Sequence, residues 1–128
     1  MRLLLDTHIA LWLLIDNPKV SEKARSLIIA AGDQVYVSAV SIWEISIKHR
    51  LLPAQMPISG QMAKTRFAAA GLQLLPISAE HAAQVDTLEL HHRDPFDRML
   101  IAQSRSEPLH LLTRDAQLTI YSELVVLV

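Results

Sequence analysis

The chain has 128 residues, of which 51% are hydrophobic, and it carries 12 basic against 13 acidic residues and no cysteine. Its length predicts one domain over residues 1–128, and the lack of cysteine excludes disulfides and thiolate metal sites. The near-neutral charge excludes a protein that binds nucleic acid through a strong basic excess alone. We therefore expect a cytoplasmic domain, part of whose apolar surface meets a partner.

The N-terminal apolar run is too short to span a bilayer, and Asp6 and His8 interrupt it, so it predicts a buried strand followed by a helix. The expected strands are, in chain order, Arg2–Leu5, Gln34–Val37, Gln73–Ile77, His110–Thr113 and Leu124–Val128. The stretches with helical spacing are Ile9–Ile15, Ser21–Ala31, Ser41–Leu51, Ser59–Ala70, Ala79–His91 and Pro95–Ser106. This alternation is typical of an α/β fold with a parallel sheet covered on both faces.

Four acidic residues lie near the points where a predicted strand gives way to a helix: Asp6, Glu44, Asp97 and Asp115. Asp6 directly follows the first strand, and Asp115 follows the fourth. Glu44 and Asp97 fall in the first turns of predicted helices. Because the carboxyl ends of parallel strands share one edge of a sheet, we expect the four carboxylates to gather there.

Most of these acids also have an explanation as helix-capping residues. Asp6 and Asp115 are candidate N-caps that accept hydrogen bonds from free backbone N–H groups. In Asp94-Pro95-Phe96-Asp97, Asp94 is the candidate cap, Pro95 the favoured first helical residue, and Asp97 the acid of the first turn.

Glu44 has two such explanations. Ser41 and Glu44 have the spacing of a capping box, in which the glutamate accepts a hydrogen bond from the Ser41 N–H. Lys48, four residues further along the helix, is spaced for an ion pair with Glu44.

Taken together, the four carboxylates favour a functional site over four separate caps. Two carboxylates about 5 Å apart repel by roughly 3 kcal/mol at an effective dielectric constant of about 20, whereas a cap contributes only about 1 kcal/mol. A cation would offset this repulsion, and oxygen ligands favour Mg²⁺, with Mn²⁺ as a substitute, over zinc. A site of this kind supports the hydrolysis of phosphodiester bonds.

Four segments of the sequence carry a resemblance to a known family: Leu4–His8, Ser38–Ile45, His92–Gln103 and Leu111–Asp115. The third, which contains Asp94-Pro95-Phe96-Asp97-Arg98, is the most specific. The chain resembles PIN-domain ribonucleases, and closely the toxins of the VapC type. The resemblance implies a Rossmann-like three-layer α/β/α sandwich with a mainly parallel central sheet of about five strands.

By this resemblance, Asp6, Glu44, Asp97 and Asp115 are the catalytic and metal-binding residues. Asp97 rather than Asp94 holds the third position, because the apolar segment that follows Asp97 matches the family's helix. Asp94 then remains a cap or a supporting group.

The resemblance implies a Mg²⁺-dependent endoribonuclease that acts on RNA as the toxin of a type II toxin–antitoxin pair. It also implies a homodimer and a cognate antitoxin protein that blocks the acidic pocket. Two alternatives stay open: a housekeeping PIN-type nuclease that processes RNA, and a non-catalytic α/β binding or signalling module whose acids are caps or a regulatory cation site.

Three supporting residues each have two interpretations. Thr7 and Thr113 flank acids and either orient a metal-bound water or serve as ordinary turn and cap residues. Arg98 either contacts a substrate phosphate or is a solvated residue of the first helical turn.

Other polar and aromatic residues are expected to be structural. His91 and His92 with Asp94 have loose metal-ligand chemistry, but the histidines are better explained as residues at a helix C-terminus that complement its dipole. Trp12 and Trp43 are expected in the core or an interface rather than stacked on bases.

Overall fold

The computed structural model describes residues 1–128 and contains one five-stranded sheet, in which every pair of neighbouring strands is parallel. The strands are β1 (Leu3–Leu5), β2 (Val35–Ser38), β3 (Gln73–Leu75), β4 (His110–Thr113) and β5 (Val125–Leu127). Their order is β3-β2-β1-β4-β5, and Leu3 of β1 lies beside Val35 of β2 and His110 of β4. All five predicted strands are confirmed, and β1 lies at the centre.

Helices connect successive strands, as the βαβ pattern predicts. They are α1 (Thr7–Leu14), α2 (Glu22–Ala31), α3 (Ala39–Leu51), α4 (Gly60–Ala69), α5 (Ala79–Gln84) and α6 (Pro95–Ser106). Two 3₁₀ helices complete the chain, η1 (Val85–Thr87) and η2 (Ala116–Tyr121). None of the helices is long and apolar enough to cross a membrane.

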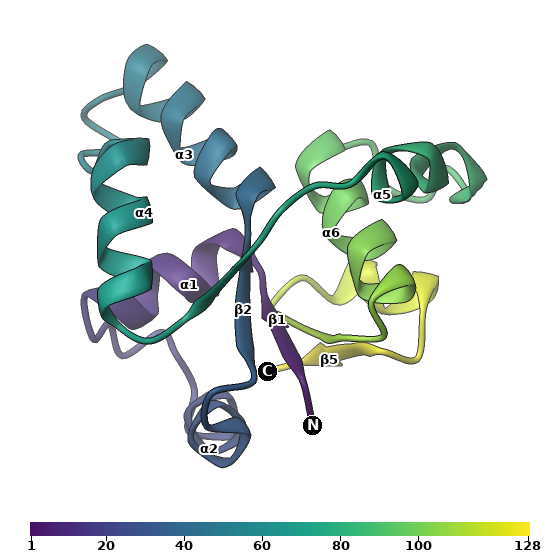
Figure 1. The fold of residues 1–128 in the computed structure, drawn as a ribbon, viewed down its shortest axis with the longest axis horizontal. Coiled ribbons are helices and arrows are strands. Elements are labelled where there is room, and N and C mark those ends of the chain that lie inside the picture. Colours follow the sequence, from purple (N-terminus) through teal and green to yellow (C-terminus); the bar gives the residue numbers. More distant parts are fainter.

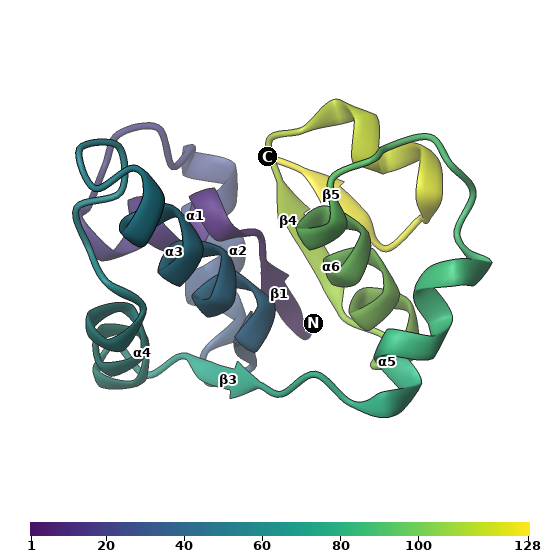
Figure 2. The same cartoon turned by 90° about the horizontal axis from the view of Figure 1, so that it is seen from above.

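The helices form two layers around the sheet, which confirms the three-layer α/β/α sandwich. Figures 1 and 2 show α1, α2 and α4 on one side of the central strands and α5 and α6 on the other. Leu3 and Leu5 of β1 belong to the apolar core on the first side, and Leu4 belongs to the core on the second. Because strand side chains alternate between the faces, a run of leucines fills both cores.

The helix expected over residues 79–91 is shorter than predicted. α5 ends at Gln84, η1 ends at Thr87, and the chain then runs without regular structure to Asp94. The guanidinium of Arg98 in α6 donates hydrogen bonds to the carbonyl oxygens of Val85, Leu88 and Glu89. In a longer helix, these carbonyl groups would accept hydrogen bonds from the helix's own main chain.

α3 begins earlier than predicted, so the Ser41–Glu44 capping box is wrong. Ser38, the last residue of β2, is the N-cap, and its Oγ accepts a hydrogen bond of 3.0 Å from the Val40 N–H. Strand β2 therefore passes directly into α3, and Glu44 lies one turn deeper in the helix than a capping-box residue would.

Candidate metal centre

Asp6 lies at the centre of the sheet edge where β1 ends. It is the N-cap of α1, as predicted, because its Oδ1 accepts a hydrogen bond of 2.8 Å from the Ile9 N–H. Its Oδ2 accepts one of 2.6 Å from Oγ1 of Thr113, the last residue of β4. Cap and strand-end contacts thus hold one buried carboxylate in a single orientation.

The buried position of Asp6 changes its acidity. Burial raises the pKa of Asp6 above its ordinary value of 3.8, and the charge of Glu44 adds to this effect. Hydrogen bonds from Thr113 and from the Ile9 N–H oppose the shift because they stabilise the ionised form. A buried carboxylate beside another acid favours the binding of a cation.

Glu44 is buried on α3 and makes two contacts with neighbouring side chains. Its Oε1 accepts a hydrogen bond of 2.8 Å from Oγ1 of Thr7, the first residue of α1. Its Oε2 lies 2.5 Å from Lys48 Nζ, so the predicted ion pair within the helix is confirmed. Thr7 Oγ1 also lies 2.8 Å from Ser41 Oγ, which links the start of α1 to α3.

Asp97 lies in the first turn of α6 and is half-buried. Asp94 is the N-cap of this helix and accepts hydrogen bonds from the N–H groups of Phe96 and Asp97, at 2.8 and 3.1 Å. Pro95 is the first helical residue, so this part of the capping prediction is confirmed.

The surroundings of Asp97 strongly raise its pKa. Burial and, second, the charge of Asp94 raise the pKa of Asp97 from 3.8 to about 7, although His92 opposes the shift. Asp6 and Glu44 also raise the pKa of Asp97, which shows that their charges reach it across the sheet edge. A group that ionises near neutrality at the cost of like-charge repulsion is typical of a functional site.

Asp115 lies two residues beyond β4 and begins η2. It is the predicted N-cap, since its Oδ1 accepts a hydrogen bond of 2.9 Å from the Gln117 N–H. Its own N–H donates to Thr113 Oγ1 at 3.0 Å, so the Thr113 hydroxyl contacts both Asp6 and Asp115.

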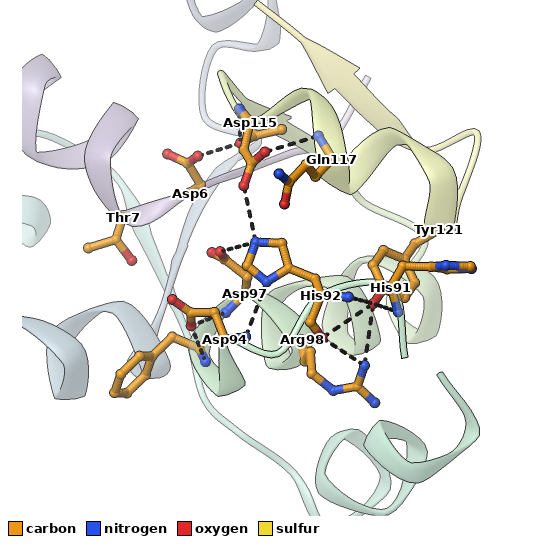
Figure 3. A network of polar contacts seen from close by, with 12 residues as sticks. Asp6, Thr7, His91, His92, Asp94, Asp97, Arg98, Asp115, Gln117 and Tyr121 are labelled. Atoms are coloured by element: carbon orange, nitrogen blue, oxygen red, sulfur yellow. Dashed lines mark hydrogen bonds and ion pairs between the residues drawn. The ribbon is translucent and has the colours of Figure 1, made fainter. Parts of the chain in front are cut away.

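The structure therefore brings together the four predicted acids, which we call the acidic site: Asp6, Glu44, Asp97 and Asp115. Figure 3 shows Asp6, Asp97 and Asp115 facing a common region from three different segments of the chain. Thr7 and Thr113 lie beside it, and both hydroxyls donate to carboxylates of the site. The acidic site is rich in oxygen donors and contains no thiolate, a donor set that fits Mg²⁺ or Mn²⁺.

His92 lies in the acidic site, which the sequence analysis missed. Its Nε2 is 3.2 Å from Asp115 Oδ2 and 3.5 Å from Asp97 Oδ2 (Figure 3). One ligand atom each from His92, Asp97 and Asp115 lies within 4.8 Å of the other two, a spacing that could hold a metal ion. The prediction of a helix C-terminus was wrong for both histidines because η1 ends at Thr87, four residues earlier.

Arg98 fits neither of its two predicted roles. Its side chain is buried, with a residue exposure of 8%, and its guanidinium donates to main-chain carbonyls and to Tyr121 Oη. It is therefore neither solvated nor free to contact a phosphate. The position of Arg98 next to Asp97 in the sequence did not predict this buried role, since adjacent helical residues point in different directions.

Trp43 is 57% exposed, so of its two predicted places the core is wrong and an interface stays a prediction. It packs edge-to-face on Phe96 with ring centroids 5.4 Å apart. Trp43 directly precedes Glu44 in α3 and Phe96 directly precedes Asp97 in α6, so this aromatic pair joins the two helices that carry these acids.

Comparisons with known proteins agree with this fold. The sequence matches the PIN domain family over residues 3–124. No curated protein matches it significantly.

Several solved structures share the fold. A toxin–antitoxin complex from Klebsiella pneumoniae contains a chain with a TM-score of 0.65 and 21% identity, over 97% of this chain and 95% of that one. VapBC2 from Rickettsia felis, bound to a DNA fragment from its promoter, has a TM-score of 0.69 and 12% identity over 99% and 97% of the two chains. FitAcB from Neisseria gonorrhoeae has a TM-score of 0.60 and 20% identity over 92% and 91%.

Proposed function

The chain belongs to the PIN domain family, and we propose that it is a Mg²⁺-dependent endoribonuclease that acts as the toxin of a type II toxin–antitoxin pair. One observation carries the nuclease proposal: four acids from distant parts of the chain meet at the carboxyl edge of β1, β2 and β4. Burial, and after it the charges of neighbouring acids, raise the pKa of Asp97 to about 7. Separate helix caps give no reason for such a cluster.

In this proposal, Asp6 and Asp97 hold the cation, and Glu44 and Asp115 complete the acidic site. When bound, the cation supplies an activated water and offsets the charge that develops on the leaving oxygen. The chain supplies orientation: Thr113 fixes the Asp6 carboxylate, and Thr7 fixes that of Glu44. These hydrogen bonds prearrange the carboxylates before the substrate arrives.

The aromatic pair of Trp43 and Phe96 supports an RNA substrate with an unpaired base near the scissile bond. The exposed ring of Trp43, braced by Phe96, offers a surface on which a base can stack. Arg93 is exposed next to His92 and is available for a phosphate contact.

An apolar groove of about 440 Å³ between α1, α4 and residues 55–58 supports an antitoxin partner. Its lining includes Leu11, Leu14, Ile15, Ile58 and Met62. Ile15 is 64% exposed, so the isolated chain leaves this apolar surface uncovered. The apolar residues of an antitoxin segment would fill it, as would be expected from the similarity to toxin–antitoxin complexes.

We also propose a homodimer. Leu90 and Ile120 are 82% and 62% exposed, and neither lines the groove. They leave apolar surface for a second copy while an antitoxin occupies α1 and α4.

Cleavage of a structured RNA with and without Mg²⁺ tests the nuclease proposal directly. We expect Asp6→Asn and Asp97→Asn to lose activity. Asp33→Asn is the matched control, because Asp33 is exposed and lies two residues before β2, at the opposite end of that strand from the acidic site. Cleavage that survives chelation of the metal, or equal cleavage by wild type and Asp97→Asn, would contradict the proposal.

Expression in cells separates the toxin from its alternatives. A toxin should arrest growth when expressed alone and should be neutralised when the neighbouring gene is expressed with it. A housekeeping nuclease would cleave RNA in vitro without this pattern of arrest and rescue. A binding module would keep its effect on cells when all four acids are neutralised.

A further inference from the structure

We propose that His92 is a positioning residue of the acidic site, whose Nε2–H group holds the carboxylates of Asp97 and Asp115 in the arrangement that receives the cation. The proposal rests on the proposed function only in requiring a cation there. His92 is not itself a ligand, although its distances to the two acids resemble those of a His-Asp-Asp metal site.

The hydrogen bond on the far side of the ring determines which nitrogen carries the proton. The Asp94 N–H donates to His92 Nδ1 at 3.1 Å. A backbone N–H can only donate, so Nδ1 must present its lone pair. A neutral imidazole with Nδ1 as acceptor carries its proton on Nε2.

The protonated Nε2 faces the two carboxylates, at 3.2 Å from Asp115 Oδ2 and 3.5 Å from Asp97 Oδ2 (Figure 3). A nitrogen that carries a proton has no lone pair left for a metal ion. His92 therefore donates to Asp115 and faces Asp97 with its N–H group instead of binding the cation itself, and it offsets part of the repulsion between the two carboxylates.

The main chain on either side of His92 is also held in place. Tyr121 Oη accepts hydrogen bonds from the N–H groups of His91 and His92, at 3.0 and 2.7 Å. Arg98 Nη1 lies 3.3 Å from the His92 carbonyl oxygen and donates to it. With both its main chain and its Nδ1 bound, the ring has one orientation, which is what a positioning residue requires.

Asp97 and Asp115 come from α6 and from the segment after β4, and His92 is a side chain that contacts both. Removing a hydrogen-bond partner of metal ligands commonly weakens metal binding by about 10- to 100-fold. We therefore expect His92 to affect the affinity for a cation and not only the rate of cleavage.

Mn²⁺ binding measured by calorimetry and electron paramagnetic resonance tests this role without an activity assay. His92→Leu should weaken binding by about tenfold or more, and His92→Gln, whose amide N–H can replace Nε2–H, should recover most of it. His91→Leu is the matched control, because His91 pairs with Glu89 outside the acidic site. Unchanged or tighter binding by His92→Leu, or equal losses in the Leu and Gln variants, would overturn the proposal.

Long-range ¹H–¹⁵N spectra of the wild-type imidazoles supply a second test, which remains available if His92→Leu does not fold. We expect His92 to carry its proton on Nε2 and to keep it when Mg²⁺ is added. A proton on Nδ1, or loss of the Nε2 proton on binding Mg²⁺, would make His92 a ligand and overturn its role as a donor.

A wild-type protein that binds neither Mg²⁺ nor Mn²⁺ would instead contradict the proposed function. Normal binding by the wild type together with unchanged binding by His92→Leu would overturn only the positioning role.

Discussion

Thr113 Oγ1 donates a hydrogen bond of 2.6 Å to Asp6 Oδ2 and so joins two residues that are 107 positions apart in the chain. Thr113 is the last residue of β4, and Asp6 directly follows β1. The same hydroxyl accepts a hydrogen bond from the Asp115 N–H. One threonine therefore holds the carboxylate of Asp6 and the main chain of Asp115.

Thr113→Val should remove this contact while preserving the shape of the side chain. We expect the affinity for Mn²⁺ to fall about tenfold, because the Asp6 carboxylate loses its orienting donor. The free energy of unfolding should fall by about 1 to 3 kcal/mol, since the Asp115 N–H loses its acceptor. Thr113→Ser, which keeps the hydroxyl, is the control and should bind Mn²⁺ nearly as the wild type does; equal affinities for wild type and Thr113→Val would contradict the role of the hydroxyl.

Asp97→Asn should stabilise the metal-free protein near neutral pH, although we expect the same variant to lose cleavage activity. The folded pKa of about 7 lies above the ordinary 3.8. The folded state therefore favours the protonated form of Asp97. The stability that this form provides is fully present below about pH 4 and is lost as the pH rises through about 7, where Asp97 ionises. Urea unfolding should show a gain of about 2 kcal/mol for Asp97→Asn at about pH 8 and little change at about pH 4. A loss of stability at the higher pH would show that the Asp97 charge is not repelled in the folded protein.

Mg²⁺ binding should release a proton below about pH 7, because the ion binds the ionised form of Asp97. The apparent affinity should therefore fall by up to about tenfold for each pH unit below the pKa of Asp97. Calorimetry in buffers of different ionisation enthalpy measures the released proton directly. Asp97→Asn should remove that proton release; an affinity that is constant between about pH 5.5 and 8 would argue against Asp97 as a ligand.

Arg98→Lys should destabilise the fold by about 2 to 4 kcal/mol, because an ammonium cannot satisfy the several main-chain acceptors that the guanidinium reaches. The exposed neighbour Arg93 provides the control, and Arg93→Lys should leave stability unchanged. Urea unfolding measures this structural role of Arg98. A variant with normal stability and weaker RNA binding would indicate a phosphate contact instead of a structural one.

Trp43→Ala should raise KM for a single-stranded RNA substrate by about tenfold, since stacking contributes about 1 to 3 kcal/mol per base. kcat should change little, because Trp43 makes no contact with the carboxylates of the acidic site. Trp43→Phe keeps an aromatic face and should retain most of the affinity. If Trp43→Ala leaves KM unchanged but dissociates a dimer in sedimentation experiments, the exposed ring belongs to a protein interface.

Much of the fold could be predicted from the sequence because its signals are local. The leucine run of β1 and the Asp94-Pro95 cap of α6 both appear in the structure as expected. The Asp6 and Asp115 caps do as well. Two boundaries were predicted wrongly. The capping box at Ser41 failed because Ser38 caps α3 three residues earlier, and the helix expected to reach His91 ends early in a segment whose carbonyl groups bind Arg98.

The sequence by itself determined the α/β alternation and the placement of Asp6, Glu44, Asp97 and Asp115 near strand-to-helix junctions, because hydrophobic periodicity and capping act within a few residues. Only the tertiary structure decided the roles of His92 and Arg98. Arg98 donates to carbonyl groups where the chain leaves the helix, and the segment that follows places His92 beside the acids. Such contacts join segments that are distant in sequence, so no local pattern of residues encodes them.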